Sequence, residues 1–128
     1  MAHANAAIKP FILLVDDDPD ICCALTDLLE HEQYQVFAVG TGTDAIATAK
    51  AHRFSIAILD LGLPDFDGLS VLKALRRIDS TVPIIILTAL TEEDGKTECL
   101  AAGAYAFVSK PYNKDELKAI LTRAVIAA

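Results

Sequence analysis

Four aspartates lie within eight residues near the start of the chain, in the stretch LLVDDDPD at 13–20. Carboxylates this close repel one another, so the stretch needs either full solvation or a nearby cation. Asp18 precedes a proline and an apolar pattern of helical spacing, which is typical of a helix cap, and Asp20 then becomes a first-turn acid favoured by the helix dipole. Asp16 and Asp17 directly follow an aliphatic run, where they form either a solvated loop or a metal site.

Strand-like and helix-like patterns alternate along the chain five times. The predicted strands are Phe11–Val15, Gln35–Val39, Ile56–Leu59, Pro83–Leu87 and Tyr105–Ser109, and the predicted helices lie near 19–31, 43–52, 67–78, 92–102 and 114–126. Strict alternation of this kind predicts an α/β fold of the (βα)5 type. Its five-stranded parallel sheet is doubly wound, with right-handed helical crossovers on both faces.

The composition of the strands predicts their order in the sheet. The runs FILLV, IAIL and IIIL are apolar on both faces, as expected for strands covered by helices on both sides. The second strand has fewer bulky aliphatic residues, and the fifth alternates with alanine and serine, so these two fit the edges. The prediction is the order 2-1-3-4-5, with a ligand site at the carboxyl ends of the central strands.

Polar side chains end the predicted strands at that edge of the sheet. From the first strand to the fifth they are Asp16 and Asp17, Asp60, Thr88, and Lys110. Three converging carboxylates need compensating charge, which the lysine ammonium and a Mg²⁺ ion would supply, because Mg²⁺ takes oxygen ligands and keeps several waters. Each residue alone has an ordinary explanation as a turn residue, a strand-end hydroxyl or a solvated charge. Their joint placement is the specific signal.

Length and composition restrict the class of protein. The chain has 128 residues, of which 53% are hydrophobic and 23% charged, which fits one globular domain, predicted to cover residues 9–128 after a flexible tail at 1–8. The net charge of −7 and the lack of a basic stripe argue against binding nucleic acid. No segment approaches the length of a membrane span, and Cys22, Cys23 and Cys99 have no metal-ligand spacing, so reduced thiols and a cytoplasmic location are expected.

The chain resembles a response-regulator receiver domain of two-component signalling from about Phe11 to Ala124. The resemblance is carried by four motifs in family order: VDDDP at 15–19, LDLGLPDFDG at 59–68, ILTA at 86–89 and VSKPY at 108–112. It implies a flavodoxin-like fold and a protein that takes a phosphoryl group from a sensor histidine kinase or a phosphotransfer protein. Such a protein is no enzyme beyond its own phosphorylation and dephosphorylation.

Site residues follow from the resemblance motif by motif. Asp60 would be the phosphoacceptor. Asp16 and Asp17 would be the acidic pair of the metal site, in which Asp17, Asp60 and the main-chain carbonyl of Gly62 bind Mg²⁺. A glycine at that place is no obstacle, because only its main chain is required.

The last two motifs carry the remaining roles. Lys110 would hold one phosphoryl oxygen, aimed by a cis bond to Pro111, and Thr88 would hydrogen-bond another. Thr88 and Phe107 also match the family's switch pair, in which the hydroxyl moves toward the phosphoryl group and the ring turns inward. Phe107 lacks the hydroxyl of the tyrosine that many relatives carry.

The helix near 92–102 is expected to be the least stable. It has Gly95 in its first turns, few large apolar residues, chiefly Leu100 with Cys99, and Gly103 at its end. The resemblance makes this helix, the strand 105–109 and the helix 114–126 the face for output and for a homodimer.

Two other functions compete with a phosphoacceptor. An aspartate-nucleophile phosphohydrolase also places close aspartates after a strand, but this chain lacks the threonine or valine expected after the second aspartate of that motif and is short for a fold with a substrate cap. A pseudo-receiver would bind partners without taking phosphate, and the complete set of polar residues weighs against it. Both a stand-alone regulator and a receiver from a longer regulator or hybrid kinase fit the sequence.

Overall fold

The computed structural model describes residues 9–89 and 92–127 and has the predicted alternation of strands and helices. The strands are β1 (Phe11–Val15), β2 (Gln35–Val39), β3 (Ile56–Leu59), β4 (Ile84–Thr88) and β5 (Ala106–Ser109). The helices are α2 (Pro19–His31), α3 (Gly42–Ala51), α4 (Gly68–Ile78), α5 (Glu92–Ala101) and α6 (Lys114–Ala127). The predicted flexible tail at 1–8 lies outside the described residues. No helix within the described residues is long and apolar enough to cross a membrane.

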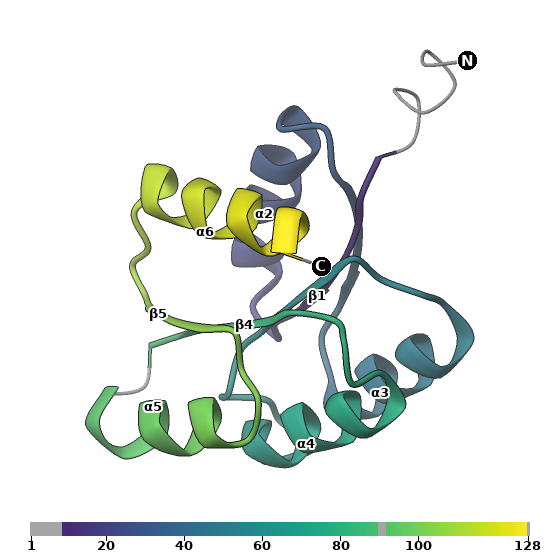
Figure 1. Cartoon of the computed structure of the whole chain (residues 1–128), viewed down its shortest axis with the longest axis vertical. Coiled ribbons are helices and arrows are strands. Elements are labelled where there is room, and N and C mark those ends of the chain that lie inside the picture. The colour runs from purple at the N-terminus through teal and green to yellow at the C-terminus, as the bar shows by residue number, and fades with distance from the viewer. Residues whose placement is uncertain (1–8, 90–91, 128) are drawn as a thin grey trace.

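The five strands form one parallel sheet in the predicted order, β2-β1-β3-β4-β5. Helices α2 and α6 cover one face of the sheet, and α3, α4 and α5 cover the other (Figure 1). This arrangement confirms the doubly wound α/β fold. It also places all five carboxyl ends of the strands at one edge.

Alternate residues of the central strands serve two separate cores. In β1, Ile12 and Leu14 pack toward α2 and α6, whereas Leu13 and Val15 pack toward α3, α4 and α5. Strands β3 and β4 are buried along their whole length, and β2 is mostly exposed or half-buried. The central strands therefore read as continuous apolar runs because they are covered on both faces.

Two strands begin one residue later than predicted. Pro83 has no N–H to donate to the ladder, although its carbonyl accepts a hydrogen bond from the amide of Ala57 at 3.0 Å. The amide of Tyr105 donates to the carbonyl of Ile84 at 2.8 Å. Pro83 and Tyr105 therefore each directly precede a strand and each take part in one of these hydrogen bonds between strands.

Helix α5 buries little apolar surface. Among its described side chains Cys99 is buried, whereas Leu100, which was expected to share the apolar face, is 43% exposed. Gly103 has a φ of +106° and follows the helix, as predicted for its end. By comparison, α6 buries Leu117 and Leu121 almost completely. The weak packing of α5 agrees with the expectation that it is the least stable helix.

Candidate functional site

The site residues are held in place by hydrogen bonds that continue the sheet one residue beyond three of its strands. The amide of Asp16 donates to the last carbonyl of β2 at 3.1 Å, and that of Asp60 to the last carbonyl of β1 at 2.9 Å. The amide of Lys110 donates to the last carbonyl of β4 at 2.8 Å. Because these strands are parallel and in register, the three side chains emerge side by side.

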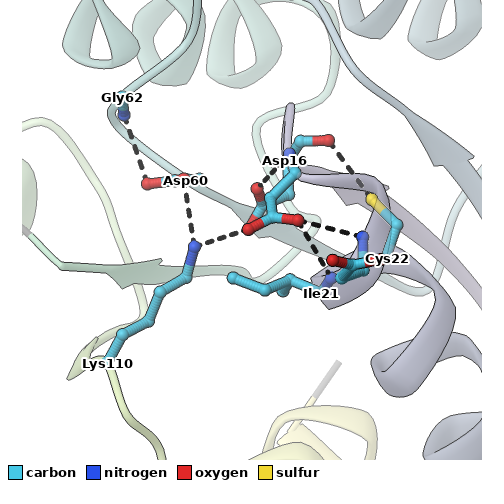
Figure 2. Close-up of polar contacts among 8 residues, drawn as sticks. Asp16, Ile21, Cys22, Asp60, Gly62 and Lys110 are labelled. Carbon is cyan, nitrogen blue, oxygen red and sulfur yellow. Dashed lines mark hydrogen bonds and ion pairs between the residues drawn. The ribbon is translucent and has the colours of Figure 1, made fainter.

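Lys110 joins two buried carboxylates, as Figure 2 shows. Its Nζ lies 2.6 Å from Oδ2 of Asp16 and 3.1 Å from Oδ2 of Asp60. The other oxygen of Asp60 accepts a hydrogen bond from the amide of Gly62 at 3.2 Å, and the other oxygen of Asp16 accepts one from the amide of Asp18 at 2.9 Å. Burial disfavours the Lys110 ammonium, but its hydrogen bonds to both carboxylates outweigh this and hold its pKa above the ordinary value.

Asp16, Asp17 and Asp60 form an oxygen-ligand cluster that fits a hard divalent cation. One carboxylate oxygen of each residue lies within 4.8 Å of the others. Asp16 and Asp60 are buried and Asp17 is exposed, so one side of the cluster is open to water. Among the described residues Lys110 is the one cation paired with these three carboxylates, which leaves two negative charges that a divalent ion would balance. Oxygen ligands with access for water match the preference of Mg²⁺.

The remaining acids of the opening stretch have the local roles predicted for them. Oδ1 of Asp18 accepts hydrogen bonds from the amides of Asp20 at 2.9 Å and Ile21 at 3.4 Å, which caps α2. Asp20 lies in the first turn. Cys23 is exposed and Cys22 half-buried, and the Cys22 thiol donates to the carbonyl of Asp16 at 3.2 Å. Burial and the nearby Asp16 carboxylate raise the pKa of Cys22, which keeps this thiol protonated.

The two predicted switch residues lie on the strands behind the cluster. Thr88 is buried at the end of β4, beside the end of β5, and Phe107 is half-buried in β5. A methyl group built at Gly95 of α5 would lie 3.7 Å from the Phe107 ring, so the ring packs beneath α5. The Lys110–Pro111 peptide bond is cis, as the resemblance implied.

Asp65 has a role that the sequence did not reveal. It lies in the loop after β3, and its carboxylate accepts hydrogen bonds from the first turn of α3. The donors are the amide of Gly42 at 2.8 Å, the amide of Thr43 at 3.0 Å and the hydroxyl of Thr43 at 2.7 Å. The only sequence signal was a short acidic side chain among turn formers, which predicts a local turn rather than a contact across 22 residues.

These contacts predict a pH dependence of stability. Hydrogen bonds from the hydroxyl and amide of Thr43, together with that from Gly42, lower the pKa of Asp65 from 3.8 to about 2. Because this pKa is lower in the folded chain than in the unfolded one, the stabilisation is complete above the unfolded value and is lost as the pH falls toward the folded one. We expect Asp65→Asn to unfold at lower urea concentration than the wild type at about pH 5, and the difference to shrink at about pH 3. An equal difference at both pH values would contradict this assignment.

Comparison with known proteins places the chain in a family. Residues 12–122 match the family described as response regulator receiver domain. The transcriptional regulatory protein KdpE of Mycobacterium tuberculosis is 43% identical over 89% of this chain and 50% of its own length. The cell cycle transcriptional regulator CtrA of Caulobacter vibrioides is 33% identical over 83% of this chain and 46% of its own length. The chain thus spans about half the length of these curated relatives.

Solved structures agree with the sequence comparison. A CheY-like response regulator receiver domain protein from Methanospirillum hungatei superposes with a TM-score of 0.90 at 28% identity, covering 93% of this chain and 95% of the other. The receiver domain of a sensor histidine kinase from Pseudomonas aeruginosa, with a magnesium ion coordinated in its active-site cleft, gives a TM-score of 0.84 at 32% identity, covering 92% and 98%. With its parallel sheet and acidic edge, the chain therefore belongs to the response regulator receiver domain family of two-component systems.

Proposed function

We propose that Asp60 accepts a phosphoryl group from the phosphohistidine of a sensor histidine kinase or a phosphotransfer protein, in a Mg²⁺-dependent reaction. The observation that carries the proposal is the setting of Asp60 itself. Its carboxylate is buried, one oxygen is oriented by the Gly62 amide and the other by Lys110, and Asp16 and Asp17 adjoin it. Membership of the receiver family, whose domains are phosphoacceptors rather than conventional enzymes, supports the same role.

The reaction is a nucleophilic displacement at phosphorus. A carboxylate oxygen of Asp60 forms the new P–O bond as the P–N bond of the phosphohistidine breaks. The imidazole, which carries a proton on its other ring nitrogen, leaves as a neutral ring. Lys110, which now contacts Asp60, is placed to transfer its hydrogen bond to a phosphoryl oxygen as negative charge develops there. The Thr88 hydroxyl is proposed to bind a second phosphoryl oxygen. Dephosphorylation is proposed to be self-catalysed as well, by water attack on the aspartyl phosphate.

Asp17, Asp60 and the carbonyl of Gly62 are proposed to hold the Mg²⁺ ion, with Asp16 completing the acidic pair. The cluster's uncompensated charge and its open side support this assignment. The ion would supply charge neutralisation at the phosphoryl oxygens and at the attacking carboxylate. The magnesium ion in the related receiver from Pseudomonas aeruginosa adds support by likeness.

The output is proposed to begin with Thr88 and Phe107. Movement of the Thr88 hydroxyl toward the phosphoryl group would leave space behind it, into which the Phe107 ring turns. Because this ring packs beneath α5 at Gly95, its rotation would first change the packing of that helix. The small buried surface of α5 gives it a low cost of local opening, so it is the element expected to respond most.

Hydrogen exchange tests this expectation for α5. We expect the amides of α5 to exchange faster than those of α6, and to show the largest change when Asp60 carries a phosphoryl mimic such as beryllofluoride. The physical reason is that α6 buries several aliphatic side chains where α5 buries Cys99. Protection of α5 equal to that of α6, and unchanged by the mimic, would refute the idea.

Partners and location are part of the same proposal. The upstream partner is a histidine kinase or phosphotransfer protein in the cytoplasm. The face formed by α5, β5 and α6 is proposed for output and for a homodimer. Leu100 of α5 and Tyr105, which directly precedes β5, are exposed large side chains of these segments. The relatives KdpE and CtrA are transcriptional regulators about twice as long as the match, so a DNA-binding output would lie in another domain or protein.

Intact-mass analysis after incubation with acetyl phosphate tests the proposed function. The wild type with Mg²⁺ is expected to gain one phosphoryl group, and both Asp60→Asn and chelation of the metal are expected to prevent the gain. Folded wild-type protein that gains nothing in any condition would refute the proposal and favour a pseudo-receiver. Repeated turnover of small phosphate esters would instead favour a phosphohydrolase.

A further inference from the structure

The loop between β3 and α4 is closed at its base. Gly62 and Asp67 pair in an antiparallel bridge, and the Asp67 side chain caps α4 by accepting the amide of Leu69 at 3.2 Å. Gly68 packs directly on Leu61, since a methyl group there would lie 2.3 Å from the Leu61 Cα. Gly62 lies at the base of this loop, so the position of Gly62 depends on the position of the whole loop.

The tip of this loop is fastened to the N-terminus of α3. Asp65 accepts the three hydrogen bonds from Gly42 and Thr43 described above. The ring of Phe66 packs on Gly42, where a methyl group would lie 2.7 Å from Cδ2 of that ring. The contact therefore requires glycine at 42. It combines apolar packing of Phe66 with hydrogen bonds to both carboxylate oxygens of Asp65.

The segment that leads from the end of β2 into α3 also contacts the loop that carries Asp17. The carbonyl of Val39 accepts the amide of Asp16 at 3.1 Å. A methyl group at Gly40 would lie 3.7 Å from the Asp16 carbonyl oxygen and 3.8 Å from the Asp17 Cα, so this segment lies next to the Asp17 loop at ordinary van der Waals distance. Residues 39–43 thus contact both loops that carry the proposed metal ligands.

We propose that Asp65 is a positioning residue for the metal site: by fastening the β3–α4 loop to the start of α3, it fixes the distance between Gly62 and Asp17 and so sets the affinity for Mg²⁺. The inference rests on the proposed function of the site. Mg²⁺ requires near-ideal octahedral geometry with short ligand distances. The site therefore binds Mg²⁺ more weakly if the loop no longer holds the Gly62 carbonyl in place. Groups that hold metal ligands in place typically change affinity by about 10-fold to 100-fold when removed.

Thr41 provides a matched control. Its hydroxyl caps the same turn of α3 by accepting the amide of Asp44 at 3.0 Å, but none of the contacts that fasten the β3–α4 loop involves it. Thr41→Ala and Asp65→Ala both remove a cap from α3, and only the second releases the loop. A merely structural role for Asp65 would therefore give the two variants the same metal affinity.

The experiment is a Mg²⁺ titration of the isolated chain, followed by NMR at the backbone amides of Asp17 and Gly62. Asp65→Ala is expected to weaken binding by about 10-fold or more, and Thr41→Ala to change it by less than about 2-fold. Asp65→Asn, which keeps one acceptor oxygen, should fold and give an intermediate value if the alanine variant is unstable. In the acetyl phosphate reaction, the Asp65 variants should need more Mg²⁺ but reach a near wild-type rate at saturation.

The outcomes separate the two proposals. Wild-type binding that Asp65→Ala and Asp65→Asn leave unchanged, or that Thr41→Ala weakens equally, overturns the positioning role and leaves the metal site standing. A wild type that shows no saturable shift with Mg²⁺ overturns the metal site, and the positioning role with it.

Discussion

Replacing Lys110 with alanine is expected to slow phosphorylation of Asp60 by acetyl phosphate by about 100-fold or more. The Lys110 ammonium lies 2.6 Å from Asp16 and 3.1 Å from Asp60, and it is the cation placed to meet the charge that develops on the phosphoryl group. Loss of a preorganised charge at such a place removes stabilisation that exists mainly in the transition state. The rate should be followed by intact mass at saturating Mg²⁺.

The Lys110→Ala variant should also bind Mg²⁺ more tightly. Removal of the ammonium raises the net negative charge of the cluster from two to three. A slower reaction together with tighter metal binding separates an electrostatic role from general damage to the site. Lys118→Ala is the control, since this lysine forms a half-exposed ion pair with Glu32 at 3.4 Å, away from the cluster, and should leave the rate unchanged. A Lys110→Ala rate within about threefold of the wild type would contradict the role proposed for Lys110.

Gly68→Ala is expected to lower the free energy of unfolding by about 3 kcal/mol. Its methyl group would lie 2.3 Å from the Cα of Leu61 and 2.8 Å from the Leu61 carbonyl oxygen, both of which are backbone atoms that cannot move aside alone. Leu61 lies between Asp60 and Gly62, so the shift would also disturb the site and reduce phosphorylation. Urea unfolding measures the first effect and intact mass the second.

Gly95→Ala is the control for this prediction. Its methyl group would meet Leu61 and Phe107 at 3.6 and 3.7 Å, which are ordinary contact distances. Because alanine is the better helix former, this change in α5 should stabilise the chain by about 0.5–1 kcal/mol. A Gly68→Ala variant as stable as the wild type would show that the approach of α4 to the β3–α4 loop is less tight than the structure has it.

The parts of the fold and site that the sequence predicted follow from local rules. Apolar runs on both faces identified the central strands, and the parallel order then required the residues after β1, β3 and β5 to meet at one edge. Asp16, Asp60 and Lys110 were therefore found together without any knowledge of their contacts. The cap at Asp18 was likewise predictable, because it binds amides two and three residues later.

The parts that the sequence did not predict depend on contacts between distant segments. Asp65 caps a helix that begins 23 residues earlier, and Arg76 of α4 donates to the carbonyl of Gly103, 27 residues later, at 2.7 Å. No rule of sequence spacing predicts such pairs, because the distance between their residues depends on how the helices pack against the sheet. The exposure of Leu100 has the same origin, since the face that α5 turns inward is set by its neighbours.

Chemical identification of the phosphorylated residue tests directly whether Asp60 accepts the phosphoryl group. After reaction with acetyl phosphate and Mg²⁺, borohydride reduction converts an aspartyl phosphate to homoserine, which peptide mass spectrometry then locates. We expect homoserine at position 60 alone, and none when Mg²⁺ is chelated. Homoserine at position 16 or 17, or phosphorylated protein with none at position 60, would contradict this expectation.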